Sequence, residues 1–441
     1  MTRLVAEKAG LRFLARFGFA PMLAMIVGLG LLVWGAGEPS AQEAAPVLTS
    51  SSPVFGECRT GYWSSNRNLD DQAGGASTTC FGSWKPVLGG GVSLGLNARA
   101  TGAAQRMEIS RGRVREAYLR FDQGPWTARV GRQVIAWGRS DRISPTDNLS
   151  PRDYTALLAD DDEQRQGLDA ASLRYELSQA VSMTAIVARF EGDTLPKGTL
   201  PPNLVDTTRP GRSEYAIKLD RSGVGLDWSL SYYDGFDRTP RYRPELPIGS
   251  SPALSRSYEG NRTFGADLAL PAGNWTIRGE AAVTLSDPTC TSCGGESRRT
   301  HKIVVGAERD IGESISLALQ LYGVHRNNYR SPVVQPAALI PLYDGLDRLN
   351  SEFSKNDLGA TARLSGRFLN DRLKLELGVL FHQPVGSNAS YVLRPRTTYA
   401  LSDHIKISAG ADRFYGDTQS YFGARKKNGL SFVEAVFVLP F

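Results

Sequence analysis

The densest set of charged residues lies in one segment, residues 137–166, here called the charged loop. Carboxylates and guanidinium groups are mixed there, so the segment can form ion pairs within itself or with another charged surface. Its charged residues are Arg139, Asp141, Arg142, Asp147, Arg152, Asp153, Asp160, Asp161, Asp162, Glu163 and Arg165. The four carboxylates at 160–163 could also bind a divalent cation loosely, but they lack the spacing and the glycine of a calcium loop. We therefore predict ion pairing here, with no specific metal site and no cofactor.

Residue types that carry catalysis are sparse in the rest of the chain. There are 4 histidines, and none stands in a recognisable serine- or aspartate-based catalytic arrangement. We therefore predict that the protein is not an enzyme. Lysine and arginine number 51 against 45 acidic residues, for a net charge of +6. Because the two signs are interspersed, the charge does not indicate a nucleic-acid partner.

The amino-terminal 41 residues have the pattern of a secretory signal peptide. Basic residues come first, residues 17–37 carry no charge, and small residues precede Gln42. A retained membrane anchor is the alternative, because the uncharged stretch is long enough to span a bilayer. We favour cleavage, which makes 1–41 a signal peptide and the chain an exported protein.

Beyond the leader, apolar residues alternate with polar or small ones at a period of two. Examples are the stretches 275–285, 315–322 and 373–381, each with one apolar face. Short turns are expected at 122–125, 178–179, 221–224, 271–273, 311–313, 369–371 and 401–404. Longer polar loops are expected at 102–111, 137–166, 192–211, 236–258, 286–298, 325–352, 383–389 and 415–429.

This alternation of short turns and long loops is typical of an outer-membrane barrel. The sequence predicts an all-β protein, a transmembrane antiparallel up-and-down β-barrel with about 16 strands between residues 91 and 441, with 14 or 18 strands as alternatives. The short turns would be periplasmic and the long loops external. The barrel is assigned to 89–441, and 42–88, which has little apolar periodicity, is assigned to a periplasmic or plug-like segment.

The carboxy terminus ends in an aromatic residue with apolar residues alternating before it. Phe441, Leu439 and Phe437 lie on one face, which resembles the terminal signal of bacterial outer-membrane barrels. We therefore predict the bacterial outer membrane as the location, with its lipid, its lipopolysaccharide and the barrel-assembly machinery as partners.

The polar faces of the predicted strands carry both charges, with a slight basic excess. The predicted pore-wall residues are Arg120, Arg129, Arg174, Arg278, Arg363, Arg367, Lys374, Arg394 and Arg396. Rings of basic residues favour anions in pores. The same arginines could instead pair with wall carboxylates and only brace the barrel, and the sequence does not decide between these roles.

The chain has 4 cysteines, Cys58, Cys80, Cys290 and Cys293. An even number in an exported chain predicts two disulfides, with three pairings open. The local pairing, 58 with 80 and 290 with 293, is favoured because the two pairs should lie at opposite ends of the barrel.

The segment 130–177 carries a family resemblance. It contains Gly131-Arg132-Gln133, Trp137-Gly138, Asp141, Asp147, Pro151, Asp153, the acidic cluster at 160–163 and Arg165. In this it resembles an uncharacterised family of porin-like proteobacterial outer-membrane proteins, similar in appearance to alginate-export barrels. The resemblance implies an outer-membrane channel and no catalytic site.

We therefore predict a channel for passive passage of small polar solutes, with anions as one candidate class. The charged loop would fold inward and narrow the lumen, although a solvated external flap is an alternative. Export of a secreted polysaccharide and uptake of hydrophobic compounds are the alternative functions. A homotrimer is a candidate assembly, since many sixteen-strand porins are trimers.

Overall fold

The computed structural model describes most of the chain after residue 53. The described residues are 54–65, 74–103, 110–156, 158, 160–195, 204–206, 210–245, 253–287, 298–329, 345–346 and 349–440. The predicted signal peptide at 1–41, the terminal Phe441 and the pair Cys290 and Cys293 lie outside these ranges. No helix in the described ranges is both long and apolar enough to cross a membrane.

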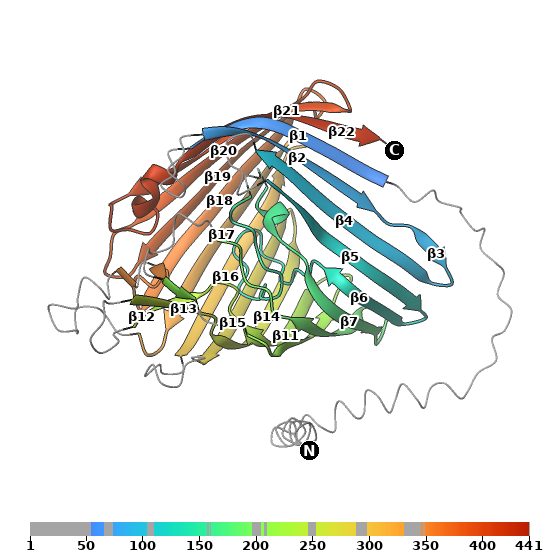
Figure 1. Cartoon of the computed structure of the whole chain (residues 1–441), viewed down its shortest axis with the longest axis horizontal. Coiled ribbons are helices and arrows are strands. Elements are labelled where there is room, and N and C mark those ends of the chain that lie inside the picture. Colours follow the sequence, from blue (N-terminus) through green and yellow to red (C-terminus); the bar gives the residue numbers. More distant parts are fainter. Residues whose placement is uncertain are drawn as a thin grey trace, which may run out of the picture. The chain divides into compact units, whose positions relative to one another are not determined.

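One antiparallel sheet closes on itself as a barrel (Figure 1). Successive strands pair with each other, and the last strand, β22, pairs with the first, β1. The barrel strands are β1 Val54–Ser65, β2 Gly74–Trp84, β4 Val92–Ala103, β5 Arg111–Gln123, β6 Trp126–Gln133, β7 Leu168–Glu176, β8 Val181–Arg189, β10 Ser213–Arg221, β11 Asp227–Phe236, β14 Gly260–Ala272, β15 Trp275–Asp287, β16 Arg298–Ile311, β17 Ile315–Arg326, β18 Asn356–Phe368, β19 Leu373–Pro384, β20 Ser390–Ala400, β21 Ile405–Gly416 and β22 Leu430–Pro440.

The barrel has 18 strands, so the expected number of about 16 is wrong and the alternative of 18 is confirmed. All the expected short turns and long loops from residue 91 onward are found between these strands. A three-residue strand, β3 Val87–Gly89, lies in the turn before β4. A separate small sheet joins β9 Leu204–Asp206, β12 Arg241–Glu245 and β13 Ala253–Ser257 within the long loops.

The two additional strands, β1 and β2, come from the segment expected to be periplasmic or plug-like. Residues 54–65 and 74–84 pair with each other, and β1 closes the barrel against β22. The assignment of 42–88 outside the barrel is therefore wrong for these residues, and so is the barrel start at 89. Their outward positions hold small residues such as Gly56, Thr78 and Gly82, which leaves a weak apolar period. These two stretches form wall and not a plug, whereas uptake of hydrophobic compounds as such stays a prediction.

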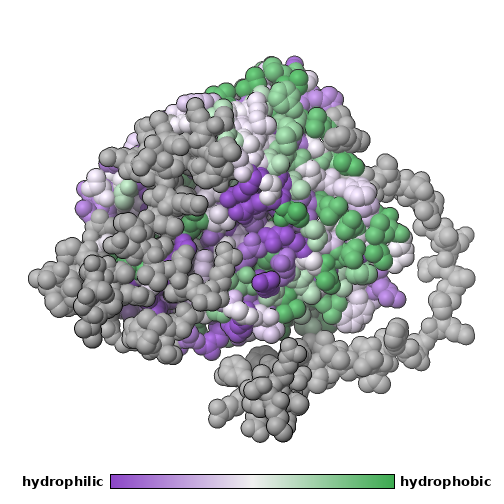
Figure 2. All heavy atoms as spheres, viewed as in Figure 1, coloured by the Kyte–Doolittle hydropathy of each residue, from purple (hydrophilic) through white to green (hydrophobic). Residues whose placement is uncertain are grey.

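Side chains alternate between a lipid-facing and a lumenal surface, as the period of two predicts. On the outer face Leu321 is 68% exposed and Ile303 is 56% exposed, whereas the lumenal Gln320 is 4% exposed. Figure 2 shows hydrophilic residues gathered near the middle of one view, with hydrophobic ones beside them over the strands at the right. The lumen thus has a polar wall that can hold a charged segment.

A disulfide joins Cys58 to Cys80, which are directly paired across β1 and β2. The expected local pairing is confirmed for this pair. Because the two cysteines share the outward face with Tyr62, the disulfide lies on the wall and not in the lumen.

Candidate functional site

The charged loop follows β6 and lies inside the ring of barrel strands (Figure 1). Its hydrogen bonds and ion pairs reach strands on several sides of the barrel, from β1 and β4 to β15 and β20. A solvated external flap would not make these contacts.

Glu280 on β15 holds the first part of the loop. Its carboxylate is 3% exposed and accepts hydrogen bonds from four donors within 3.0 Å. The donors are the backbone N–H of Arg139 at 2.7 Å, the backbone N–H of Ser140 at 2.6 Å, the Ser144 hydroxyl at 2.8 Å and the Thr146 hydroxyl at 3.0 Å. A buried carboxylate with this many donors fixes the local backbone, because the two backbone N–H groups and the Thr146 hydroxyl would lose their acceptor without it.

The turn around Glu280 requires glycine at position 138. Gly138 has φ +90°, and a Cβ there would lie 2.6 Å from a carboxylate oxygen of Glu280 and 2.1 Å from the Ser144 hydroxyl. Any side chain would therefore push the turn away from the wall.

Arg139 reaches the acidic part of the wall. Its guanidinium pairs with Asp267 on β14 and, at 2.8 Å, with Asp220 on β10. Two further loop residues, Asp141 and Arg142, contact β18 and β19, farther round the wall. Asp141 accepts two hydrogen bonds from Arg363, at 2.6 and 3.1 Å, and Arg142 lies 3.2 Å from Glu376 on β19.

A short 3-10 helix, η3 Asp161–Gln164, carries two further wall contacts. Asp161 accepts two hydrogen bonds from Arg394 on β20, one of them at 2.8 Å. Glu163 accepts two from Arg59 on β1, at 2.6 and 2.7 Å. The planar guanidinium and the carboxylate match each other in both pairs, which gives strong and directional bonds.

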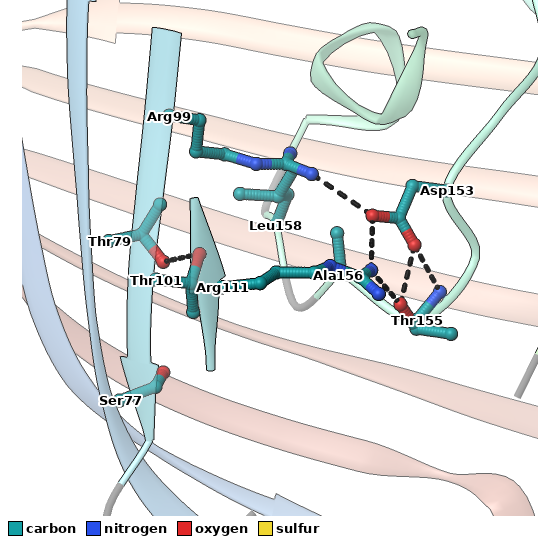
Figure 3. A pocket seen from close by; sticks show the side chains of 9 residues that line it. All are labelled: Ser77, Thr79, Arg99, Thr101, Arg111, Asp153, Thr155, Ala156 and Leu158. Carbon is teal, nitrogen blue, oxygen red and sulfur yellow. Dashed lines mark hydrogen bonds and ion pairs between the residues drawn. The ribbon is translucent and has the colours of Figure 1, made fainter. Parts of the chain in front are cut away.

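Asp153 contacts arginines of β4 and β5 (Figure 3). Its carboxylate is fully buried and lies 3.1 Å from Arg99, 2.5 Å from Arg111 and 3.8 Å from Arg113. The remaining charged residues of the loop pair within it. Arg165 pairs with Asp147 and, at 3.2 Å, with Asp162; Arg152 lies 3.8 Å from Asp147; and Asp160 accepts the backbone N–H of Asp162 at 2.9 Å.

Charge is therefore sorted across the lumen. The loop arginine Arg139 contacts carboxylates on β10 and β14, whereas the loop carboxylates contact arginines on β1, β4, β5, β18 and β20. Arg142, which pairs with Glu376 on β19, is the exception. This complementarity positions the loop in one orientation, because rotating it would place like charges together.

The predicted pore-wall residues fall into two groups. Arg278, Arg363 and Arg394 contact the loop, with Arg278 donating to the Arg139 carbonyl at 3.0 Å. The second group lies along the wall strands. Arg396 pairs with Asp412, Arg120 pairs with Asp122, and Lys374 lies 3.8 Å from Glu376. Arg129 lies over the ring of Tyr118, Arg174 is on β7 and Arg367 is on β18. Bracing and contact with the loop therefore both occur.

Arg111 and Arg113 were not expected in the lumen. By strict alternation from Phe121 they would face lipid. A β-bulge changes this: Asn97 pairs with Glu116 but Ala98 pairs with Val114, so Arg115 has no partner on β4. The extra residue turns the preceding arginines inward. For this strand, the signal available in the sequence was three arginines within the five residues 111–115. Arg59 was missed because its strand, β1, was not predicted.

The pKa values of two loop carboxylates predict an effect of acid. Burial would raise the pKa of Asp161, but hydrogen bonds and charge from Arg394 hold it below the ordinary value of 3.8. The pKa of Asp153 is likewise lowered, against burial, by Thr155, Arg113 and Arg111. A carboxylate whose pKa is lowered in the docked loop stabilises docking at pH values above its ordinary pKa. This stabilisation is lost as the pH falls through the lowered pKa.

We therefore expect single-channel conductance to be constant from neutral pH to about pH 5 and to rise below about pH 4, as the loop undocks. Recordings in planar bilayers over this range check it. A rise centred near neutral pH, or none in acid, would contradict the role of these carboxylates.

In the described ranges no group of three or more His, Cys, Asp or Glu side chains is placed to hold a metal ion. The run at 160–163 instead divides its carboxylates among Arg394, Arg59, Arg165 and a backbone N–H.

A family model described as "Protein of unknown function (DUF1302)" matches residues 57–196, which run from β1 into the loop after β8 and include the whole charged loop. No curated protein matches the chain. The remaining strands are matched by solved structures.

Solved outer-membrane porins share the fold at low identity. OccAB1 from Acinetobacter baumannii is 11% identical with a TM-score of 0.55, covering 91% of this chain and 99% of that one. OpdK from Pseudomonas aeruginosa, solved with vanillate, is 10% identical with a TM-score of 0.55, covering 89% and 99%. OccK3 (OpdO) from the same organism is 10% identical with a TM-score of 0.55, covering 89% and 96%.

The expected likeness to alginate-export barrels stays a prediction, as does polysaccharide export. The chain is thus a closed antiparallel β-barrel with the fold of the Occ and Opd outer-membrane porins, and its residues 57–196 are similar to a family of unknown function.

Proposed function

We propose that the protein is an outer-membrane channel for small polar solutes, with a preference for anions, and that the charged loop is its constriction. The observation that carries this proposal is the docking of the loop across the lumen, from Glu280 on one wall to Arg394 and Arg59 on others. A segment in that position lies in the path of any solute that crosses the barrel. The charged residues at 139–165 would then set the size and charge of what passes.

Anion preference is supported by the wall. Arginines of β1, β4, β5, β18 and β20 face the loop, and rings of basic residues favour anions. OpdK holds vanillate, the anion of an aromatic acid, which supports a carboxylate as the type of solute. The surrounding partners would be outer-membrane lipid and the assembly machinery, and a homotrimer stays a candidate.

The test is a single-channel recording of the full chain, refolded in detergent and inserted in a planar bilayer under a potassium chloride gradient. Discrete conductance steps with a reversal potential toward that of chloride are expected. A cation-selective reversal potential would contradict the anion preference. Silence of a folded barrel, even after the loop is replaced, would contradict the channel itself.

A further inference from the structure

We propose that Arg99, Arg111 and Arg113 form a binding site for a carboxylate anion, at which an incoming carboxylate displaces Asp153 and frees this part of the charged loop. The inference rests on the proposed function and deepens it, because it names the ligand chemistry and ties its binding to movement of the constriction.

The first support is an imbalance of charge. Three guanidinium groups converge on the single carboxylate of Asp153, at 3.1, 2.5 and 3.8 Å. The neighbouring carboxylates of Glu163 and Glu191 are directed elsewhere, to Arg59 and to Arg132. Arg99 contacts Glu163 only at its backbone carbonyl, at 3.4 Å, and leaves the Glu163 carboxylate to Arg59. Counted over the described residues, the cluster therefore holds more positive than negative charge, and it attracts a further anion.

The second support is the chemistry of the lining. Around the arginines lie the hydroxyls of Ser77, Thr79, Thr101 and Thr155 (Figure 3). Hydroxyl and guanidinium groups can all donate to oxygen, and a guanidinium matches the two oxygens of a carboxylate. A carboxylate that took the place of Asp153 would thus meet donors on more than one side.

The third support is the available space, which decides whether a carboxylate binds beside Asp153 or in its place. With Asp153 in place the cavity measures about 10 Å³, room for about one water molecule. A second carboxylate does not fit beside Asp153, so it can bind only by replacing it. The Arg111 and Arg113 side chains are 27% and 24% exposed, so an incoming anion can contact them before the fully buried Asp153 leaves.

Replacement of Asp153 has a mechanical consequence. The Asp153 backbone N–H donates to the Gln164 carbonyl at 2.8 Å, and Tyr154 donates to the Thr194 carbonyl at 3.0 Å. Release of the side chain therefore loosens the segment 151–156 from β4 and β5. Asp161 and Glu163 keep their bonds to Arg394 and Arg59, and Glu280 still holds the segment near 139–146. A solute carboxylate would open one side of the constriction as it binds.

Hydrogen–deuterium exchange of the full chain in detergent micelles tests this inference without measuring conduction. Sodium acetate is titrated against sodium chloride at constant ionic strength, so that screening of ion pairs does not change. In the wild type we expect acetate to increase exchange at 151–156 about threefold or more, with saturation. The segment 137–147 should not respond.

Three variants sharpen the test. In Arg111→Gln the acetate effect should be lost, or the acetate concentration that gives half of it should rise about tenfold. In Asp153→Ala exchange should already be fast, and acetate should now slow it by taking the place of the missing carboxylate. Arg372→Gln, which removes an arginine whose hydrogen bonds run to the backbone of residues 400 and 401, is the matched control and should respond like the wild type.

If acetate slows exchange in Asp153→Ala but does nothing in the wild type, displacement of Asp153 is overturned. If acetate acts equally in Arg111→Gln, the assignment of the site is overturned. A chain that shows the acetate response yet conducts no ions keeps this inference and contradicts the proposed function. A chain that conducts anions without the response contradicts this inference alone.

Discussion

Replacing residues 141–163 by a short glycine-serine linker is expected to raise single-channel conductance several-fold and to shift the reversal potential further toward anions. The segment holds contacts to Arg363, Arg394 and Arg59, and its removal leaves the lumen open between those walls. It also carries seven carboxylates and two arginines, a net charge of −5, so its loss leaves the wall arginines unneutralised.

The control is the same linker inserted after Gly312, in the exposed turn between β16 and β17, which should leave conductance near that of the wild type. Both variants must first show the heat-dependent gel mobility of a folded barrel. An unchanged conductance in a folded 141–163 variant would mean that the charged loop is not in the ion path.

Glu280→Ala is expected to release the first part of the loop, with frequent openings to the conductance of the linker variant. The substitution leaves two backbone N–H groups and the Thr146 hydroxyl without their acceptor, a cost of roughly 3 kcal/mol to docking. Arg139, with its own bonds to Asp220 and Asp267, would limit the movement. Exchange at 137–147 should increase together with the open probability.

Glu280→Gln should give a smaller effect, because one oxygen remains to accept while the amide nitrogen faces donors. The matched control is Glu313→Gln, which removes a carboxylate from the exposed turn between β16 and β17. Equal behaviour of Glu280→Ala and Glu313→Gln would refute the role of Glu280 as the anchor.

The sequence by itself determined the class of fold and most of its connections. Stretches such as 373–381 alternate so regularly that only a strand with one apolar face accounts for them, and the turn residues between stretches define where strands end. These signals are local, and every barrel strand from β4 onward was therefore predicted, whereas the small sheet of β9, β12 and β13 was not. The charged loop was also recognisable, because its charge density and length are properties of a continuous segment.

Only the tertiary structure decided the rest, for two physical reasons. The strands β1 and β2 have weak patterns and exist because the barrel closes against β22, which is a contact between the two ends of the chain. The bulge at Arg115 turns Arg111 and Arg113 from the lipid face to the lumen. A single extra residue does not change the composition of the strand, so the sequence pattern does not show it.

The wall residues that the charged loop contacts were also decided only by the tertiary structure. Asp153 meets Arg99, and Asp161 meets Arg394, only because barrel closure and strand register bring distant parts of the chain together. The residue types set which contacts could form, and the geometry of the closed barrel set which of them did.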